Sequence, residues 1–384
     1  MTKPLAILVG FIGKLPFAGM SFYNLHYIGG LQALGYEVHY VECNNEPCGC
    51  YDPVVDQMTD DPTYAVEYLR KVLPLFGVAK ERISFIDRQG RCHGAGWDDL
   101  RRDLGDADFL LTLCEAAWQD EFALCSRRAF VDGDPLFTQA SMLDSTSAMA
   151  HALGNYDTLF TYASRMGAND CTVPGAGRQW IPTRPVVATR YWEPTLTPAS
   201  SPVAGLVMWT GGTEVTLASG VYGFKNREFE KFMDLPRRTS QSFVLAVGGA
   251  APREKLRASG WKLLEPLQIS GTLDAYQTFI ASCRADFGIA KHAYVASRSG
   301  WFSDRSTCYL AAGRPVLHQE TGFTDWLPVG KGVLAFSSIE EVLDGLQRLD
   351  ADYDMHARAA RAIAEEHFEA ATVVGRMLDD ARLR

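Results

Sequence analysis

Short, continuous apolar runs recur along this chain and alternate with segments of helical periodicity. In the first half, five runs are expected to be buried strands, at residues 5–10, 37–42, 109–113, 128–132 and 158–161. A helix is expected between the first two, over about residues 21–34, ending at Gly35. Apolar runs of this length are typical of strands covered on both faces, and a strand–helix–strand order indicates a parallel connection. The pattern therefore predicts an α/β fold with a parallel sheet.

A proline-rich stretch interrupts this pattern between residues 173 and 203. It holds six prolines. Each fixes φ and removes a backbone donor, so we expect an extended connection between domains. The alternation then restarts, with strands expected at 206–209, 243–247 and 285–290 and helices at 226–233, 273–282, 339–349 and 354–366. We therefore predict two α/β domains, comprising residues 1–195 and 196–384.

Residues 301–323 (WFSDRSTCYLAAGRPVLHQETGF) combine a polar loop, a short helix, a glycine turn, a buried strand and a second polar loop. Helix N-termini bind anions, and ligands of open α/β sheets gather at the carboxyl ends of strands. A guanidinium binds phosphate oxygens bidentately, so Arg305 at the helix start indicates a phosphate-binding site. The alternative is that Ser303 or Asp304 only caps the helix and Arg305 points to solvent.

Other polar residues near this segment could share in ligand binding. Lys225 precedes an expected helix, and Lys291 and Arg298 lie on the approach to residue 301. Glu320 and Thr321 follow the strand and could hydrogen-bond to hydroxyl groups, or belong to a solvated loop. The predicted ligand-binding set is therefore Lys225, Lys291, Arg298, Ser303, Asp304, Arg305, Ser306, Glu320 and Thr321.

Charge and cysteine content exclude several classes of protein. The net charge of −9 argues against a nucleic-acid or anionic-membrane binder, since both normally need a basic face. No apolar run approaches the ~20 residues of a membrane span, and we expect the run at residues 5–9 to be a strand, since it is too short for the core of a signal peptide. The nine cysteines are an odd number, and the cluster at 43, 48 and 50 lacks a fourth metal ligand nearby. We expect a cytoplasmic protein with reduced thiols and no metal site.

The two α/β halves, the Gly-rich loop at residues 10–19 (GFIGKLPFAG) and the late unit LAAGRPV at 310–316 resemble GT-B fold glycosyltransferases. The likeness is to a divergent, bacterial-type member near families 1 and 4. It implies two Rossmann-like domains facing across a cleft, with the C-terminal helices packing back toward the N-terminal domain.

The resemblance also implies an activity. The C-terminal domain of such an enzyme binds a nucleotide-diphosphate sugar as co-substrate, here expected without a cofactor or metal. The N-terminal domain binds the acceptor, here a small molecule or natural product, and a hexosyl or pentosyl group is transferred in the cleft. The loop residues expected on the acceptor side are Gly13, Pro16, Phe17 and Gly19.

The chain departs from this family at one position. Many GT-B enzymes carry a carboxylate five residues before the glycine of the late unit, where it binds the ribose hydroxyls. Here that residue is Cys308. Asp304 lies one turn earlier on the same helix face and could replace the carboxylate.

An inverting transferase needs a general base beside the acceptor hydroxyl. Asp132 and Asp134, at the end of an expected strand, are the first candidates, although Asp-Gly-Asp-Pro is also strong turn chemistry. Glu115 ends another strand. His26 lies in the helix behind the first loop, where a packed histidine is the alternative to a base. A retaining enzyme would need no base.

Three other functions fit parts of the sequence. Asp132 and Asp134 also match the Asp-x-Asp motif of GT-A transferases, in which two carboxylates hold a divalent ion against the donor diphosphate. A GT-B fold epimerase would act on the donor alone, and a two-lobed binding protein would need no base. The sequence leaves open the donor, the acceptor, the stereochemistry and the oligomeric state, for which a homodimer is one option.

Overall fold

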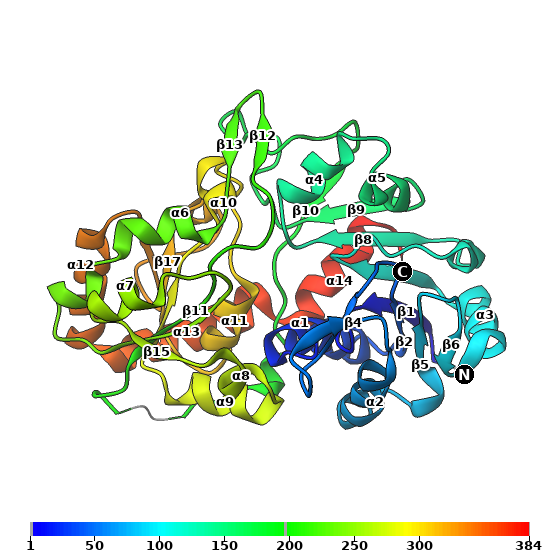
Figure 1. The fold of residues 1–384 in the computed structure, drawn as a ribbon, viewed down its shortest axis with the longest axis horizontal. Helices are drawn as coiled ribbons and strands as arrows, with labels where there is room; N and C mark the ends of the chain where they lie inside the picture. Colours follow the sequence, from blue (N-terminus) through cyan, green and yellow to red (C-terminus); the bar gives the residue numbers. More distant parts are fainter. Residues whose placement is uncertain (1–2, 196–197, 384) are drawn as a thin grey trace.

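The computed structural model describes residues 3–195 and 198–383, which form two lobes that face each other (Figure 1). Each lobe contains a largely parallel sheet flanked by helices. The N-terminal sheet is formed within residues 5–182 and the C-terminal sheet within residues 203–336. The predicted α/β fold of two Rossmann-like halves is confirmed.

The N-terminal sheet, within the described residues, has the strand order β10-β9-β8-β7-β1-β2-β5-β6. Every neighbouring pair is parallel except β5 and β6. The chain order reverses beside β1, and ligands of open α/β sheets bind outside the carboxyl ends of strands at such a reversal. The strands are β1 (Leu5–Gly10), β2 (Glu37–Cys43), β5 (Ile83–Ile86), β6 (Cys92–Gly94), β7 (Phe109–Leu113), β8 (Arg128–Asp132), β9 (Thr158–Thr161) and β10 (Trp180–Pro182).

The C-terminal sheet is parallel throughout its described strands, in the order β15-β14-β11-β16-β17-β18. The order in which the chain adds strands to this sheet reverses beside β11. The strands are β11 (Val203–Met208), β14 (Phe243–Gly248), β15 (Lys262–Leu264), β16 (Ala285–Gly288), β17 (Val316–Gln319) and β18 (Val333–Phe336). Two small hairpins stand apart, β3 (Cys50–Asp52) with β4 (Gln57–Thr59) and β12 (Val215–Leu217) with β13 (Gly220–Tyr222).

Helix α1 (Ala18–Ala33) lies between the lobes, because it contacts α9, α11 and α14 as well as its own sheet. No helix among the described residues is long and apolar enough to span a bilayer. The other helices are α2 (Thr63–Val72), α3 (Gly96–Asp106), α4 (Phe137–Met142), α5 (Ala148–Leu153), α6 (Lys225–Phe229), α7 (Arg253–Ala258), α8 (Pro266–Ser270), α9 (Leu273–Ser282), α10 (His292–Ala296), α11 (Asp304–Ala311), α12 (Ile339–Ala351), α13 (Tyr353–Ile363) and α14 (Ala370–Asp380).

The C-terminal helix α14 crosses back to the N-terminal lobe, as the red ribbon in Figure 1 shows. Val187 fixes the crossing, since its N–H donates to Phe368 O at 2.8 Å and its carbonyl accepts from Ala370 N at 2.9 Å. The helix then packs along α1, where a Cβ on Gly30 would lie 2.9 Å from Ala370 O. The absence of a side chain at Gly30 therefore permits this packing. The predicted return of the C-terminal helices is confirmed.

The proline-rich stretch differs from the extended connection expected for it. Trp180–Pro182 forms β10, so part of the stretch belongs to the N-terminal sheet. Pro182 is tolerated because β10 is an edge strand, where a missing donor interrupts no central ladder. A boundary between residues 195 and 196 stays a prediction, and α14 joins the N-terminal lobe despite its late position in the chain.

Candidate active site

A cavity of about 540 Å³ lies between the lobes, at the carboxyl ends of strands from both sheets. The N-terminal lobe lines it with the loops after β1, β7 and β8 and the start of α1. The C-terminal lobe lines it with segments after β11 and β16 and the start of α11. This position is the one expected for a ligand of open α/β sheets, and the volume lies within the ~300–1,000 Å³ of small-molecule sites.

The start of α11 forms part of the cavity wall, through Ser303, Asp304 and Arg305. A buried histidine fixes the backbone of this turn, because Ser303 N donates to His318 Nε2 at 3.2 Å. Burial lowers the pKa of His318 to about 3, so the ring stays neutral and can accept this bond. Burial also raises the pKa of the Asp304 carboxyl, although the charge of Arg305 opposes that rise.

Arg305 carries a fixed positive charge at this wall. Its guanidinium donates to Leu206 O at 2.7 Å and to Asp286 at 3.2 Å. Ser306 donates to the same buried Asp286 carboxylate at 2.6 Å. Arg305 is therefore neither solvated nor free to swing, and Ser306 is turned away from the cavity toward the sheet.

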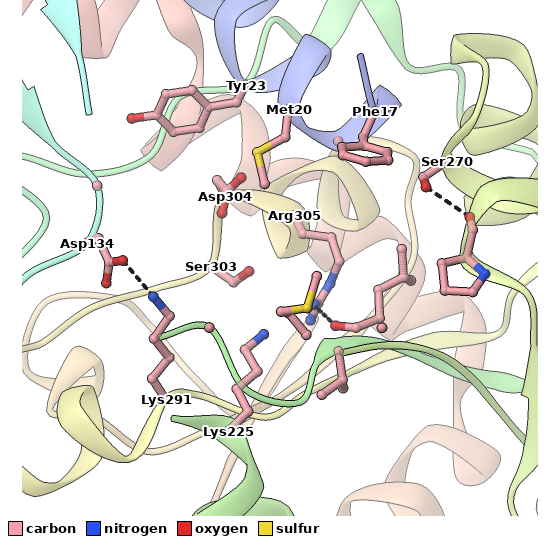
Figure 2. Close-up of a pocket in the computed structure, with 18 of the residues that line it drawn as sticks. Phe17, Met20, Tyr23, Asp134, Lys225, Ser270, Lys291, Ser303, Asp304 and Arg305 are labelled. Atoms are coloured by element: carbon pink, nitrogen blue, oxygen red, sulfur yellow. Dashed lines mark hydrogen bonds and ion pairs between the residues drawn. The ribbon is translucent and has the colours of Figure 1, made fainter. Parts of the chain in front are cut away.

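Lys225 begins α6 and extends into the cavity from the C-terminal lobe (Figure 2). No oxygen of a described residue accepts a hydrogen bond from its Nζ or forms an ion pair with it. Burial lowers the pKa of Lys225 from 10.5 to about 7, and the positive charges of Arg305 and Lys291 contribute to the shift. Three cationic side chains thus share one cavity, and Lys225 lacks an anionic partner among the described residues.

Asp134 and Lys291 meet across the cavity. Lys291 Nζ donates to Asp134 Oδ2 at 2.6 Å, and the hydroxyl of Tyr294 donates to Asp134 Oδ1. Asp134 follows β8 in one lobe, while Lys291 and Tyr294 follow β16 in the other. Figure 2 shows the Asp134–Lys291 bond at one side of the cavity. Asp134 therefore presents a carboxylate to the cavity beside a cation of the opposite lobe.

The opposite wall is apolar and aromatic. Figure 2 shows Phe17, Met20 and Tyr23, from the first loop and α1, on the side of the cavity opposite Lys225 and Lys291. The Phe17 ring lies 4.8 Å from that of Tyr51 in the β3–β4 hairpin. Trp301 crosses between the lobes, with its Nε1 donating to Gly133 O at 3.2 Å. Of the predicted acceptor-side loop, Phe17 and Gly19 line the cavity, whereas Gly13 and Pro16 do not.

Asp132, a predicted catalytic residue, lies beneath the cavity and is 0% exposed. Its carboxylate accepts hydrogen bonds from Thr138, Gln139 and Thr161, each at 2.7 Å. It also accepts from Asp134 N at 2.9 Å. Both oxygens are occupied, so Asp132 shapes the turn that presents Asp134 and is not positioned to receive a proton. The same bonds leave no oxygen of Asp132 directed at a metal ion in an Asp-x-Asp arrangement.

His26 is also buried away from the cavity, between α1 and the C-terminal lobe. Its Nδ1 accepts from Ala188 N at 3.2 Å, and its Nε2 lies 3.6 Å from Cys308 Sγ. Burial lowers the pKa of His26 to about 3. The structure therefore places His26 as a neutral packing residue and not beside the expected acceptor hydroxyl.

Four predicted ligand-binding residues lie outside the cavity lining because other groups hold their side chains. Arg298 Nε donates to Asp170 at 2.8 Å. Thr321 donates to Trp301 O at 2.5 Å, and Glu320 accepts from Gly322 N. The fourth is Ser306, bound to Asp286.

Cys308 and Asp304, the two positions considered for ribose binding, have different surroundings. Cys308 is buried against His26, while Asp304 lines the cavity. Sequence reasoning did not single out Tyr294, which binds Asp134. Tyr294 follows Lys291 by three residues in α10, and no motif marks it.

Solved structures with the same fold cover almost the whole chain. An α-glucosyltransferase in complex with UDP matches at a TM-score of 0.56 and 10% identity, over 99% of this chain and 100% of that one. Anabaena Alr3699/HepE, in complex with UDP and glucose, matches at 0.58 and 11%, over 99% and 100%. Sucrose-phosphate synthase from Thermosynechococcus elongatus matches at 0.53 and 12%, over 99% and 98%.

Residues 227–379 match the protein-family model described as Glycosyl transferase-like. The chain has the GT-B fold of these structures. No curated protein sequence matches this chain. Its second complete α/β lobe and the occupied carboxylate of Asp132 do not favour the GT-A alternative.

Proposed function

We propose that this protein is a glycosyltransferase that moves a sugar from a UDP-linked donor to a hydroxyl group of a small-molecule acceptor. Lys225 carries the proposal, because its amine lies in the cavity without a hydrogen-bond or ion-pair partner among the described residues and becomes a cation below its pKa of about 7. The donor diphosphate would lie between Lys225, Lys291 and Arg305, at the N-terminus of α11. Fixed positive charge there would stabilise the negative charge that develops on the departing diphosphate.

The donor nucleoside is proposed to be uridine, since solved structures of this fold hold UDP. Asp304 supports a ribose site, because its carboxylate lines the cavity while Cys308 faces His26. A carboxylate accepts hydrogen bonds from both hydroxyls of a ribose ring. We therefore assign ribose binding to Asp304.

Asp134 is the proposed general base. The acceptor oxygen would bond to the anomeric carbon as the bond from that carbon to the diphosphate breaks, and the hydroxyl proton would pass to Asp134. The position of Asp134 in the cavity wall, where its carboxylate lies beside Lys291, supports this role. The cations make a metal ion unnecessary for neutralising the diphosphate, so we propose a metal-independent reaction.

A small-molecule acceptor is favoured over a nucleic acid. The net charge of −9 opposes association with a polyanion, and the wall formed by Phe17, Met20 and Tyr23 is apolar and aromatic.

The proposal is tested by incubating the protein with UDP-sugars, with and without a panel of hydroxyl-bearing acceptors, and following products by mass spectrometry. We expect UDP and glycoside only when an acceptor is present, and undiminished turnover in EDTA. Isomerised donor without acceptor would indicate an epimerase. Binding of every donor without turnover would indicate a binding protein, and loss of turnover in EDTA would contradict metal independence.

A further inference from the structure

A second, smaller cavity of about 220 Å³ lies in the N-terminal lobe, at the carboxyl ends of β2 and β7. Its volume is below the ~300 Å³ at which sites for drug-sized ligands begin, so it suits a single small ring. Unlike the large cavity, it is lined mainly by polar and small side chains. These are Lys14, Cys43, Asn45, Glu46, Cys114, Glu115, Ala116, Ala117 and Met149.

Cys114 lines both cavities and separates them. Its φ of +60° is uncommon for a residue other than glycine, and its Sγ lies 3.0 Å from the hydroxyl of Tyr23. Gly133 leaves room for this side chain, since a Cβ there would lie 2.8 Å from Cys114 Sγ. The two cavities therefore meet at Cys114.

An ion pair is built into the wall of the small cavity. Lys14 is only 9% exposed, and its Nζ donates to Glu115 Oε2 at 2.6 Å. Burial alone would lower the pKa of Lys14, but the charges of Glu115 and Glu42 raise it, so Lys14 stays protonated. Burial raises the pKa of Glu115 in spite of Lys14. Buried ion pairs of this kind contribute little net stability, so stability alone does not explain this one.

The charges around this cavity favour a particular kind of ligand. The lining contains one ammonium group, on Lys14, and two carboxylates, on Glu46 and Glu115. The excess of acceptor oxygens suits a neutral or cationic ligand that donates hydrogen bonds, and it disfavours an acid.

We propose that the small cavity is the polar subsite for the acceptor and binds a hydroxylated ring that carries an amino group. The amino and hydroxyl groups donate to Glu115 and Glu46, while a hydroxyl at the other end of the acceptor passes Cys114 toward Asp134. This inference rests on the proposed function and adds the chemical class of the acceptor.

The test uses three similar rings of different charge, glucosamine, glucose and glucuronate, with binding measured by ligand-observed NMR. In the wild type we expect affinity to fall in that order. Glu115→Gln should weaken glucosamine binding about tenfold or more, because a hydrogen bond between charged groups is lost. Ala116→Leu, which leaves the ion pair intact, should exclude the ring by filling the cavity. Glu121→Gln is the matched control, since Glu121 binds Arg101 outside both cavities.

Circular dichroism and thermal unfolding establish that each variant is folded, and UDP binding is measured in parallel. Glucosamine affinity that is unchanged in both Glu115→Gln and Ala116→Leu would overturn the subsite, as would no binding of any probe to the wild type. Normal UDP binding in those cases would leave the proposed function standing. Absence of UDP binding to the wild type would instead contradict the proposed function.

Discussion

Asp134 and Lys291 belong to opposite lobes and form an ion pair across the cavity, with 2.6 Å between Oδ2 and Nζ. The proposed base is thus bound to a cation that the donor diphosphate is proposed to need. A diphosphate that took Lys291 as its partner would free Asp134 Oδ2, while Tyr294 would keep its bond to Oδ1. Donor binding and activation of the base are therefore coupled through one hydrogen bond.

Asp134→Asn should lower kcat by about 100-fold or more, because general-base catalysis contributes ~10²–10⁴. The affinity for UDP should rise, since Lys291 loses its internal carboxylate partner. Steady-state kinetics and calorimetric titration of UDP measure the two effects. A kcat close to that of the wild type would rule out Asp134 as the base.

Asp132→Asn should act on stability instead. The new amide NH₂ would face donors that now bind the carboxylate, such as Gln139 Nε2 at 2.7 Å. An unsatisfied buried polar group costs about 1–3 kcal/mol, and we expect a loss of that order in the free energy of unfolding by urea. A variant of wild-type stability with no turnover would show that Asp132 acts in the chemistry.

Lys225 should make UDP binding depend on pH. Its pKa in the free protein is about 7, and a diphosphate favours the protonated ammonium. Above pH 7, binding must take up a proton, so the affinity should fall as the pH rises. Calorimetry at pH 8 in buffers of different ionisation enthalpy should detect proton uptake in the wild type and not in Lys225→Met. Equal heats in all buffers with the wild type would contradict the assignment.

Lys225 should also make the stability of the protein depend on pH, with stability rising as the pH rises, whereas the affinity for UDP falls. The folded-state pKa of Lys225 is depressed from 10.5 to about 7, so the unfolded chain binds more protons between these values. The contribution of Lys225 to stability therefore increases with pH across that window. The unfolding free energy of the wild type, measured relative to that of Lys225→Met, should increase from pH 7 to pH 10. A constant difference would indicate an unperturbed lysine.

His26→Ala should leave the chemistry intact. The substitution removes the acceptor for Ala188 N, now at 3.2 Å, and should cost about 1–3 kcal/mol of stability. Below the unfolding transition, kcat should stay near that of the wild type, because His26 lies outside the cavity. A large fall in kcat in the folded variant would restore His26 as a candidate base.

Gly30→Ala tests the packing of α14 on α1. The added Cβ would lie 2.9 Å from Ala370 O, so we expect a loss of about 1–3 kcal/mol in unfolding free energy. Gly105→Ala in α3 is the matched control, since nothing lies within 4 Å of its Cβ position. It should be neutral or stabilise by about 0.5–1 kcal/mol. Equal effects of the two substitutions would contradict the close packing.

The sequence predicts the layout because each strand is a local apolar run. β7, β8 and β9 occupy the ranges expected for them, and α11 begins at Asp304 as its polar start indicates. Side-chain direction is harder to predict. Asp132 ends β8 and Asp134 follows it two residues later, yet the first carboxylate is buried among side-chain donors and the second lies in the cavity wall.

Long-range contacts account for most of what sequence patterns miss. The small cavity exists because β1 separates β2 from β7, which brings Lys14 beside Glu115 from 101 positions away. The Asp134–Tyr294 bond spans 160 positions and joins two lobes. Neither pair leaves a local pattern, since each depends on the order of strands or the facing of the sheets.

The central claim is that the cations of the cavity bind the donor diphosphate, and Lys225→Met tests it most directly. Arg305 is less suitable for substitution, because its loss would leave the buried Asp286 carboxylate without its cationic partner. Lys255→Met is the matched control, since Lys255 pairs with Glu230 at an exposed site. In calorimetric titration with UDP at pH 6.5, the account predicts binding about tenfold or more weaker in Lys225→Met and unchanged in Lys255→Met. Wild-type affinity in folded Lys225→Met would contradict it.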